Sequence, residues 1–145
     1  MKTFFDSNVV IASCIEEHEH HERALELLER VLGGVDIGAT SAHALAEAYA
    51  VMTRLPKPLR VTTKTAALLL EENYLKHFEI VELTGSEYGR LIIGAGQAGW
   101  VGGLIYDAIH VSCATKAAVQ RLYSWNAHHL QTVASEEFRS RIVVP

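Results

Sequence analysis

Four oxygen-bearing side chains stand where an apolar or small residue would be expected: Asp6, Glu47, Asp107 and Asn126. Asp6 ends a short apolar segment, Asp107 follows a glycine pair, and Asn126 comes directly after another apolar segment. Hard divalent cations such as Mg²⁺ and Mn²⁺ prefer oxygen ligands and keep several waters, so two or three carboxylates are enough to hold one. A shared metal ion would account for these side chains together.

Each of these residues also has a simpler interpretation. Asp6, Asp107 and Asn126 could each cap a helix, because carboxylate and amide oxygens accept hydrogen bonds from the first turn. Glu47 is harder to explain in this way, since it lies inside the segment 42–52 with Ala44, Ala48 and Val51 one turn away. We expect Glu47 to be a buried carboxylate that needs a partner.

The elements that must position these residues alternate between strands and helices. Strands are expected over 2–5, 36–39, 79–83, 121–125 and 142–144. Helices are expected over 20–32, 41–55, 62–75, from 84 onward, over 105–118 and over 128–134. This order predicts an α/β fold, a three-layer α/β/α arrangement with a mostly parallel central sheet. Ligands of such sheets bind beyond the carboxyl ends of the strands.

Composition limits the class of protein. The chain has 145 residues, of which 49% are hydrophobic and 21% charged, and this predicts one globular domain over 1–145. Cys14 and Cys113 each lie in an apolar run, which indicates buried thiols and a cytoplasmic protein. Asp6 interrupts the apolar start too early for a signal peptide, and no segment has the about 20 apolar residues of a membrane span.

The net charge of −4 does not favour a nucleic-acid binder. One stretch is different, because no acidic residue lies between Glu47 and Glu71 while four basic residues do: Arg54, Lys57, Arg60 and Lys64. This stretch is a candidate contact for a phosphate backbone, and an ordinary solvated loop and helix face is the alternative.

Four segments, taken in order, resemble the motifs of one family. They are Asp-Ser-Asn-Val-Val at 6–10, Ser-Ala-His-Ala-Leu-Ala-Glu-Ala-Tyr at 41–49, Gly-Gly-Leu-Ile-Tyr-Asp-Ala-Ile-His at 102–110 and Tyr-Ser-Trp-Asn at 123–126. Together these segments resemble the PIN-domain family and, within it, the VapC-type toxin ribonucleases of toxin–antitoxin systems. The resemblance spans nearly the whole chain.

The resemblance implies a metal-dependent endoribonuclease that uses Mg²⁺ or Mn²⁺. Asp6, Glu47 and Asp107 would be the metal ligands, and Asn126 would stand where the family often has a fourth aspartate. Ser7 and Asn8 would orient the carboxylates. The resemblance also implies an RNA substrate cleaved to a 5′-phosphate and a 3′-hydroxyl by a metal-activated water, a homodimer, a cognate antitoxin protein, and no membrane partner.

Two other functions stay open. Gly-Ala-Gly-Gln-Ala-Gly at 94–99 matches the pattern of a dinucleotide-binding turn, which would suit a nucleotide-cofactor-binding oxidoreductase. Against this, the Thr84–Glu87 capping-box spacing predicts a helix before the glycines, where the motif needs a strand. The second alternative is a catalytically silent PIN-like binding module, which Asn126 makes conceivable.

The histidines receive no catalytic role from the sequence. His18, His20 and His21 lie among glutamates before a helix, and a solvated helix start explains them better than a metal site. His110 follows Asp107 by one turn and could approach a substrate, but a partly buried helix residue is the favoured interpretation. His128 and His129 follow Asn126 and are interpreted as ordinary residues of a short helix.

Overall fold

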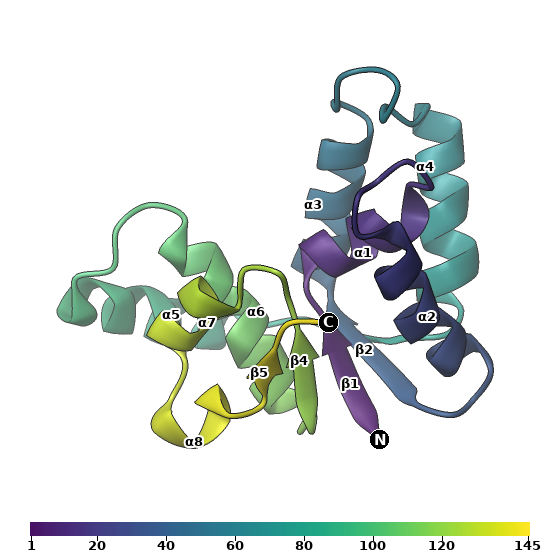
Figure 1. Cartoon of the computed structure of the whole chain (residues 1–145). Coiled ribbons are helices and arrows are strands. Elements are labelled where there is room, and N and C mark those ends of the chain that lie inside the picture. The colour runs from purple at the N-terminus through teal and green to yellow at the C-terminus, as the bar shows by residue number, and fades with distance from the viewer.

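The computed structural model describes residues 1–145 and is built on a five-stranded sheet (Figure 1). Its strands are β1 (Lys2–Phe5), β2 (Ile37–Ser41), β3 (Glu79–Val81), β4 (Arg121–Tyr123) and β5 (Ile142–Val143). The order across the sheet is β3-β2-β1-β4-β5, and every neighbouring pair is parallel. The predicted parallel sheet is confirmed, and β1 lies at its centre.

Helices cover both faces of this sheet. They are α1 (Ser7–Cys14), α2 (His21–Leu32), α3 (Ala42–Met52), α4 (Thr63–Leu70), α5 (Gly85–Ala98), α6 (Leu104–Lys116), α7 (Ala127–Val133) and α8 (Glu136–Arg139). One apolar core joins Phe5 of β1 to α1, α2, α3 and α4. The second core joins Phe4 of β1 to α6, α7 and α8. Adjacent residues of a strand point to opposite faces, so β1 supplies both cores of a three-layer α/β/α fold.

Local sequence signals determine where several helices begin and end. The Ser41 hydroxyl accepts a hydrogen bond from the Ala44 amide at 2.9 Å and caps α3. Thr84 and Glu87 form the predicted capping box at the start of α5. Gly99 ends that helix with a φ of +71°, a left-handed conformation that glycine adopts at little cost.

The position of α5 also tests the alternative that residues 94–99 form a dinucleotide-binding turn. Helix α5 runs from Gly85 to Ala98, so the Gly-Ala-Gly-Gln-Ala-Gly segment forms its last turns and follows helix rather than strand. A dinucleotide-binding turn needs a strand before it and the start of a helix after its first glycines. This segment therefore lacks the geometry of a nucleotide-cofactor site.

Two helices were not expected from the sequence. Helix α1 directly follows Asp6, and six of its eight residues are buried: Ser7, Val9, Val10, Ile11, Ala12 and Ser13. Burial on nearly all sides removes the polar stripe that identifies an amphipathic helix. Helix α8 has only four residues, too few to show a period.

Several other helices and strands begin or end a few residues away from the bounds expected from the sequence. The expected helix over 62–75 is divided, because α4 ends at Leu70 and Glu71–Leu75 continues as a π-helical turn. Three strands have bounds that differ from the expected ones. The structure has Ile37–Ser41 in place of 36–39, Glu79–Val81 in place of 79–83, and Arg121–Tyr123 in place of 121–125. No helix is long and apolar enough to cross a membrane.

Candidate active site

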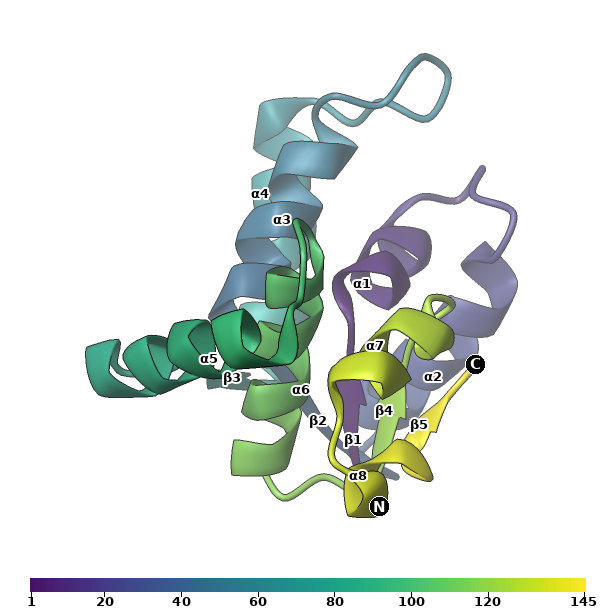
Figure 2. The same cartoon turned by 90° about the vertical axis from the view of Figure 1, so that its left-hand side faces the viewer.

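All four residues predicted to share a site line one pocket of about 360 Å³. Its polar lining consists of Asp6, Ser7, Asn8, Glu47, Tyr106, Asp107, His110 and Asn126. These residues come from the carboxyl end of β1 and from α1, α3, α6 and the start of α7. Figure 2 shows α1, α3 and α7 around the upper end of the sheet, with α6 running alongside it. The pocket therefore lies where ligands bind in open parallel sheets.

Asp6 is both a helix cap and part of the pocket wall. Its Oδ1 accepts the Ser7 amide at 2.8 Å, and its Oδ2 accepts the Asn8 side-chain amide at 3.0 Å and the Ser124 hydroxyl at 2.7 Å. The Ser124 oxygen in turn accepts hydrogen bonds from the Asn8 side chain and the Asn126 amide. This network fixes the orientation of the Asp6 carboxylate.

Glu47 is not the buried carboxylate that the sequence suggested. Its side chain is 39% exposed, because it projects into the pocket while Ala44 and Ala48 pack into the core. Its Oε1 accepts the Ser7 hydroxyl at 3.1 Å, and its Oε2 lies 3.3 Å from Nε2 of His110. The hydrogen bond to His110 is the main reason that the pKa of Glu47 lies below its usual value.

Asp107 has a different environment. It lies in the first turn of α6, where Gly103 holds the cap position, and its carboxylate accepts no hydrogen bond from the protein. Partial burial raises the pKa of Asp107, and the negative charge of Asp6 raises it further. Asn126 holds the cap position of α7, but its side chain makes no capping hydrogen bond. Helix capping therefore accounts for the presence of a carboxylate at Asp6, but it does not account for the polar side chains of Asp107 and Asn126.

His110 is a pocket residue that the sequence interpretation missed. It is 2% exposed, its Nδ1 lies 3.0 Å from the Ser41 hydroxyl, and its Nε2 lies 3.6 Å from Oδ1 of Asp6. Burial alone would lower the pKa of His110, but the carboxylates of Glu47, Asp6 and Asp107 outweigh burial and raise it. In the sequence, only its position one turn after Asp107 indicated that His110 could lie in the pocket. Its apolar helical neighbours favoured a core residue instead.

The donor chemistry of the pocket fits a divalent metal ion. Asp6, Glu47 and Asp107 bring three carboxylates to one cavity, and after burial, which is the main cause, repulsion from Asp6 and Glu47 further raises the pKa of Asp107. A bound cation would relieve this repulsion. Asn126 offers a further oxygen. His43 also approaches, with its Nε2 3.6 Å from Oε2 of Glu47.

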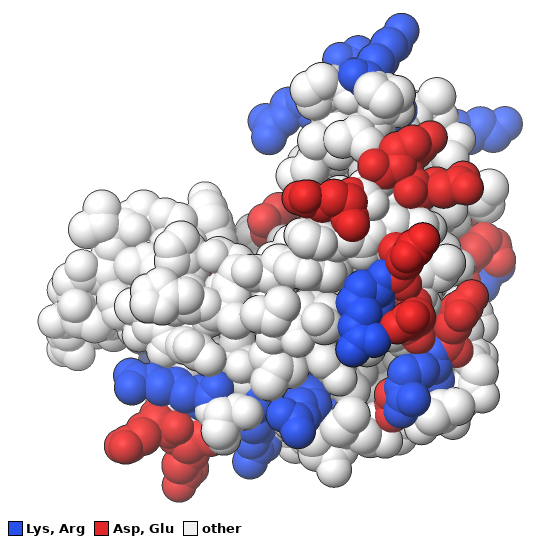
Figure 3. Space-filling model, viewed as in Figure 1, with Lys and Arg blue, Asp and Glu red and all other residues white.

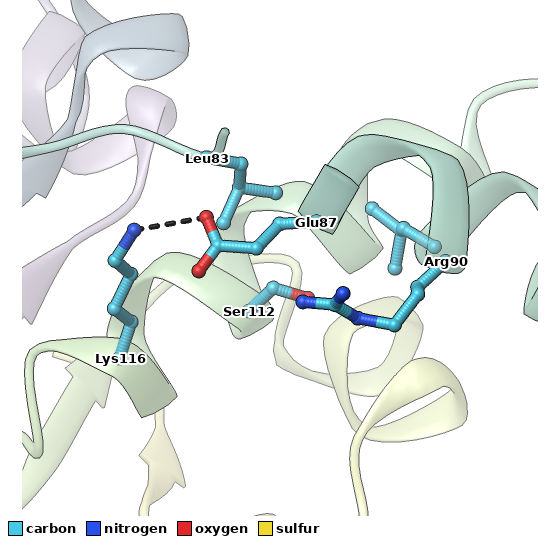
Figure 4. A pocket seen from close by; sticks show the side chains of 6 residues that line it. Leu83, Glu87, Arg90, Ser112 and Lys116 are labelled. Carbon is cyan, nitrogen blue, oxygen red and sulfur yellow. Dashed lines mark hydrogen bonds and ion pairs between the residues drawn. The ribbon is translucent and has the colours of Figure 1, made fainter. Parts of the chain in front are cut away.

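A second pocket, of about 330 Å³, lies between α5 and α6 (Figure 4). Its acidic residue, Glu87, pairs with Nζ of Lys116 at 2.9 Å and also forms the α5 capping box. Arg90, Ser112 and Leu83 complete the wall shown in the figure. Because its carboxylate is already paired with a cation, this pocket is no competitor for the acidic one as an active site.

Comparison with known proteins agrees with the geometry. The PIN domain family model matches residues 3–131. Ribonuclease VapC40 of Mycobacterium tuberculosis is 32% identical over 131 residues, which cover 88% of each chain. Ribonuclease VapC27 of the same species is 38% identical over 71 residues, which cover 49% of this chain and 50% of VapC27.

Two solved structures share the fold. The crystal structure of Mycobacterium tuberculosis VapC20, a Sarcin-Ricin loop cleaving toxin, superposes with a TM-score of 0.69 and 15% identity over 92% of this chain and 97% of that one. The crystal structure of VapBC2 from Rickettsia felis, bound to a DNA fragment from its promoter, superposes with a TM-score of 0.58 and 19% identity. This match covers 100% of this chain and 98% of that one. The family model and the identity to VapC40 together establish that this chain belongs to the PIN domain family.

Proposed function

We propose that the chain is a metal-dependent endoribonuclease and the toxin component of a type II toxin–antitoxin pair. The observation that carries this proposal is the convergence of three carboxylates, from β1, α3 and α6, on one pocket. The relatives that share most of the chain are ribonucleases by name. The silent-module alternative rests on Asn126, and metal-dependent cleavage would exclude it.

The residues divide into ligands and residues that orient them. Asp6, Glu47 and Asp107 would hold Mg²⁺ or Mn²⁺, with Asn126 as an additional oxygen donor to the metal or to substrate. When bound, the ion would lower the pKa of a water for in-line attack on a phosphodiester and offset charge on the phosphate. Ser7 and Asn8 hold the carboxylates of Glu47 and Asp6 in place. Tyr106, half exposed at the pocket, is positioned to meet the RNA.

A group of basic residues supports an RNA substrate. Arg54, Lys57, Arg60 and Lys64, here called the basic tip, are all exposed around the connection between α3 and α4. Figure 3 shows Lys and Arg gathered at this end of the molecule. The basic tip would contact the phosphate backbone of a bound RNA.

An uncharged surface supports protein partners. Between Leu91 and Thr115 the only charged residue is Asp107 when the histidine is neutral, and Ile92, Ile93 and Val101 are exposed. Figure 3 shows this part of the molecule almost free of charge. Exposed apolar side chains of this kind mark protein interfaces. We propose that they serve a homodimer and that a cognate antitoxin covers the acidic pocket.

Two further parts of the proposal concern the chain as a whole. We propose that residues 1–145 act as one nuclease domain, since β1 joins the two cores by contributing Phe5 to one and Phe4 to the other. We also propose a cytoplasmic location, supported by the two free thiols of Cys14 and Cys113.

Cleavage of total RNA by the purified protein tests the function. Wild type is compared with Asp6→Asn and Asp107→Asn in Mg²⁺, in Mn²⁺ and in EDTA, and the exposed Glu136→Gln serves as the charge-matched control. We expect discrete fragments with 5′-phosphate ends that require metal, disappear in both aspartate variants and persist in the control. Metal binding without cleavage of any RNA would favour the silent module.

A further inference from the structure

Two imidazoles converge on one oxygen of Glu47. The Nε2 atoms of His43 and His110 lie 3.6 Å and 3.3 Å from Oε2 of Glu47, and the three ligand atoms all lie within 4.8 Å of one another. His43 and Glu47 are four residues apart on α3, which places them on the same face of that helix, and His110 comes from α6. The pocket therefore contains a nitrogen-rich donor set beside the three carboxylates.

Two of the three separations in this set, both measured from Oε2 of Glu47, are close to those around a small transition metal ion. Zn²⁺ binds imidazole nitrogen at about 2.0–2.1 Å and carboxylate oxygen at about 2.0–2.2 Å, usually in a tetrahedron. Adjacent ligands of such a tetrahedron lie roughly 3.3–3.5 Å apart. The observed separations of 3.3 Å and 3.6 Å from Oε2 of Glu47 need only small side-chain adjustments to reach these values.

Each of the three side chains also contacts a second residue that restricts its orientation. The Ser41 hydroxyl lies 3.0 Å from Nδ1 of His110 and can fix the ring with Nε2 toward the pocket. Ser7 donates to Oε1 of Glu47 and leaves Oε2 for the imidazoles. The Tyr106 ring stacks on His43 at a centroid distance of 5.2 Å and an interplanar angle of 16°. Outer partners of this kind are typical of metal ligands, because they fix the ring orientation and the tautomer.

We propose that His43, Glu47 and His110 form a binding site for a transition metal ion of the Zn²⁺ class, with a fourth position open to water. Imidazole nitrogens bind Zn²⁺ much more strongly than Mg²⁺ or Mn²⁺, so this set differs in selectivity from the set formed by Asp6, Glu47 and Asp107. Glu47 belongs to both sets. A zinc ion held by the imidazoles therefore withdraws one carboxylate from the nuclease metal, and Zn²⁺ acts as an inhibitor; this consequence rests on the proposed function.

Direct titration tests the site without RNA. Purified full-length wild type, His43→Gln and the control His77→Gln compete with a chromophoric chelator for Zn²⁺. His77 is exposed and precedes β3, at the opposite end of the sheet from the pocket. We expect one Zn²⁺ per chain in wild type and control, and roughly 100-fold or greater loss of affinity in His43→Gln, since loss of an outer partner alone costs about 10–100-fold. Circular dichroism establishes that the variants fold.

Cobalt substitution reports on the ligands themselves. Co²⁺ in the wild-type site should give the intense visible absorption of a four-coordinate ion with nitrogen ligands, and His43→Gln should lose it. Equal zinc affinity in wild type and His43→Gln would overturn the proposal. So would absence of tight zinc binding, or a weak six-coordinate cobalt spectrum, and the imidazoles would then serve as ion-pair partners of the carboxylates.

A separate cleavage assay distinguishes this proposal from the proposed function. In Mg²⁺ at a fixed free Zn²⁺ concentration, zinc should inhibit wild type more strongly than His43→Gln, and equal inhibition would contradict the role of His43. If no variant cleaves RNA, the proposed function fails, while the titration and the cobalt spectrum still decide the zinc site.

Discussion

Replacing Asp6 by asparagine should destabilise the metal-free protein, although the two side chains have nearly the same shape. The two oxygens of Asp6 accept three hydrogen bonds, from the Ser7 amide, the Asn8 side chain and the Ser124 hydroxyl. Asparagine has one oxygen, so its amide group must face a donor, either the Ser7 amide or the Asn8 side chain. The substitution also removes the negative charge 3.6 Å from Nε2 of His110.

The size of this effect follows from the lost contacts. A hydrogen bond to a charged group contributes about 1.5–3 kcal/mol, and a buried donor left unpaired costs about 1–3 kcal/mol. The Ser124 hydroxyl can rotate and recover part of the loss. We therefore expect Asp6→Asn to lower the free energy of unfolding by about 2–4 kcal/mol in EDTA at neutral pH. For a chain of this length, that corresponds to a decrease in Tm of about 5–15 °C.

Asp107→Asn should have the opposite effect and raise the free energy of unfolding. The Asp107 carboxylate accepts no hydrogen bond, and burial and the charge of Asp6 raise its pKa in the folded protein. A carboxyl group whose pKa is raised by folding destabilises the native state at pH values above that pKa. Asparagine removes this penalty, and because Asp107 is partly exposed we expect a gain of only roughly 0.5 kcal/mol. The gain should be present at pH 7 and should fade as the pH falls toward and below about 3.9, the ordinary pKa of an aspartate carboxyl, because the group then becomes protonated in both states.

Urea denaturation followed by circular dichroism measures both effects. Wild type, Asp6→Asn and Asp107→Asn are unfolded in EDTA at pH 7 and again below pH 4. Adding Mg²⁺ should then stabilise wild type more than either variant, because each variant loses one of the proposed metal ligands. Destabilisation of similar size by the two substitutions, or greater destabilisation by Asp107→Asn, would refute the account of the two carboxylates.

Three further predictions test other parts of the structure. Replacing the four residues of the basic tip by glutamine should weaken RNA binding and reduce the slope of log affinity against log salt by up to about 3 units, which filter binding at several salt concentrations measures; an unchanged slope would exclude this surface. Ser124→Ala should lower Mg²⁺ affinity about 10–100-fold in calorimetric titration, because the Ser124 hydroxyl holds the proposed metal ligand Asp6 at 2.7 Å; unchanged affinity would contradict that role. Gly38→Ala should reduce stability by about 1–3 kcal/mol in urea denaturation, since its methyl group would lie 2.6 Å from the buried Phe78 ring; wild-type stability would show that Phe78 can move.

The sequence was sufficient to predict the sheet and the convergence of the candidate residues. Alternating strands and helices predict parallel strands, and the carboxyl ends of parallel strands share one edge, so Asp6 and Asn126 were expected to meet. The capping box at Thr84 correctly indicated a helix before the glycine-rich segment. These features depend on local patterns, which a single sequence displays.

Other features depend on tertiary contacts that no local pattern reveals. His110 and Ser124 contribute to the pocket through partners that lie 63 and 118 residues away in the chain. Glu47 has alanine neighbours along its helix, which suggested burial, but the neighbours that matter come from α1 and α6. Helix α1 is enclosed by other elements, so the hydrophobic period used to recognise helices is missing from its sequence.

The central position of β1 determines when the site can exist during protein synthesis. β1 and Asp6 leave the ribosome before β4 and Ser124, which pair with β1 and hold the Asp6 carboxylate from a position 118 residues later in the chain. A growing chain therefore cannot orient the Asp6 carboxylate in this way until the segment that carries Ser124 has emerged. If the proposed nuclease activity depends on this network, a nascent chain stays inactive until β4 has paired with β1.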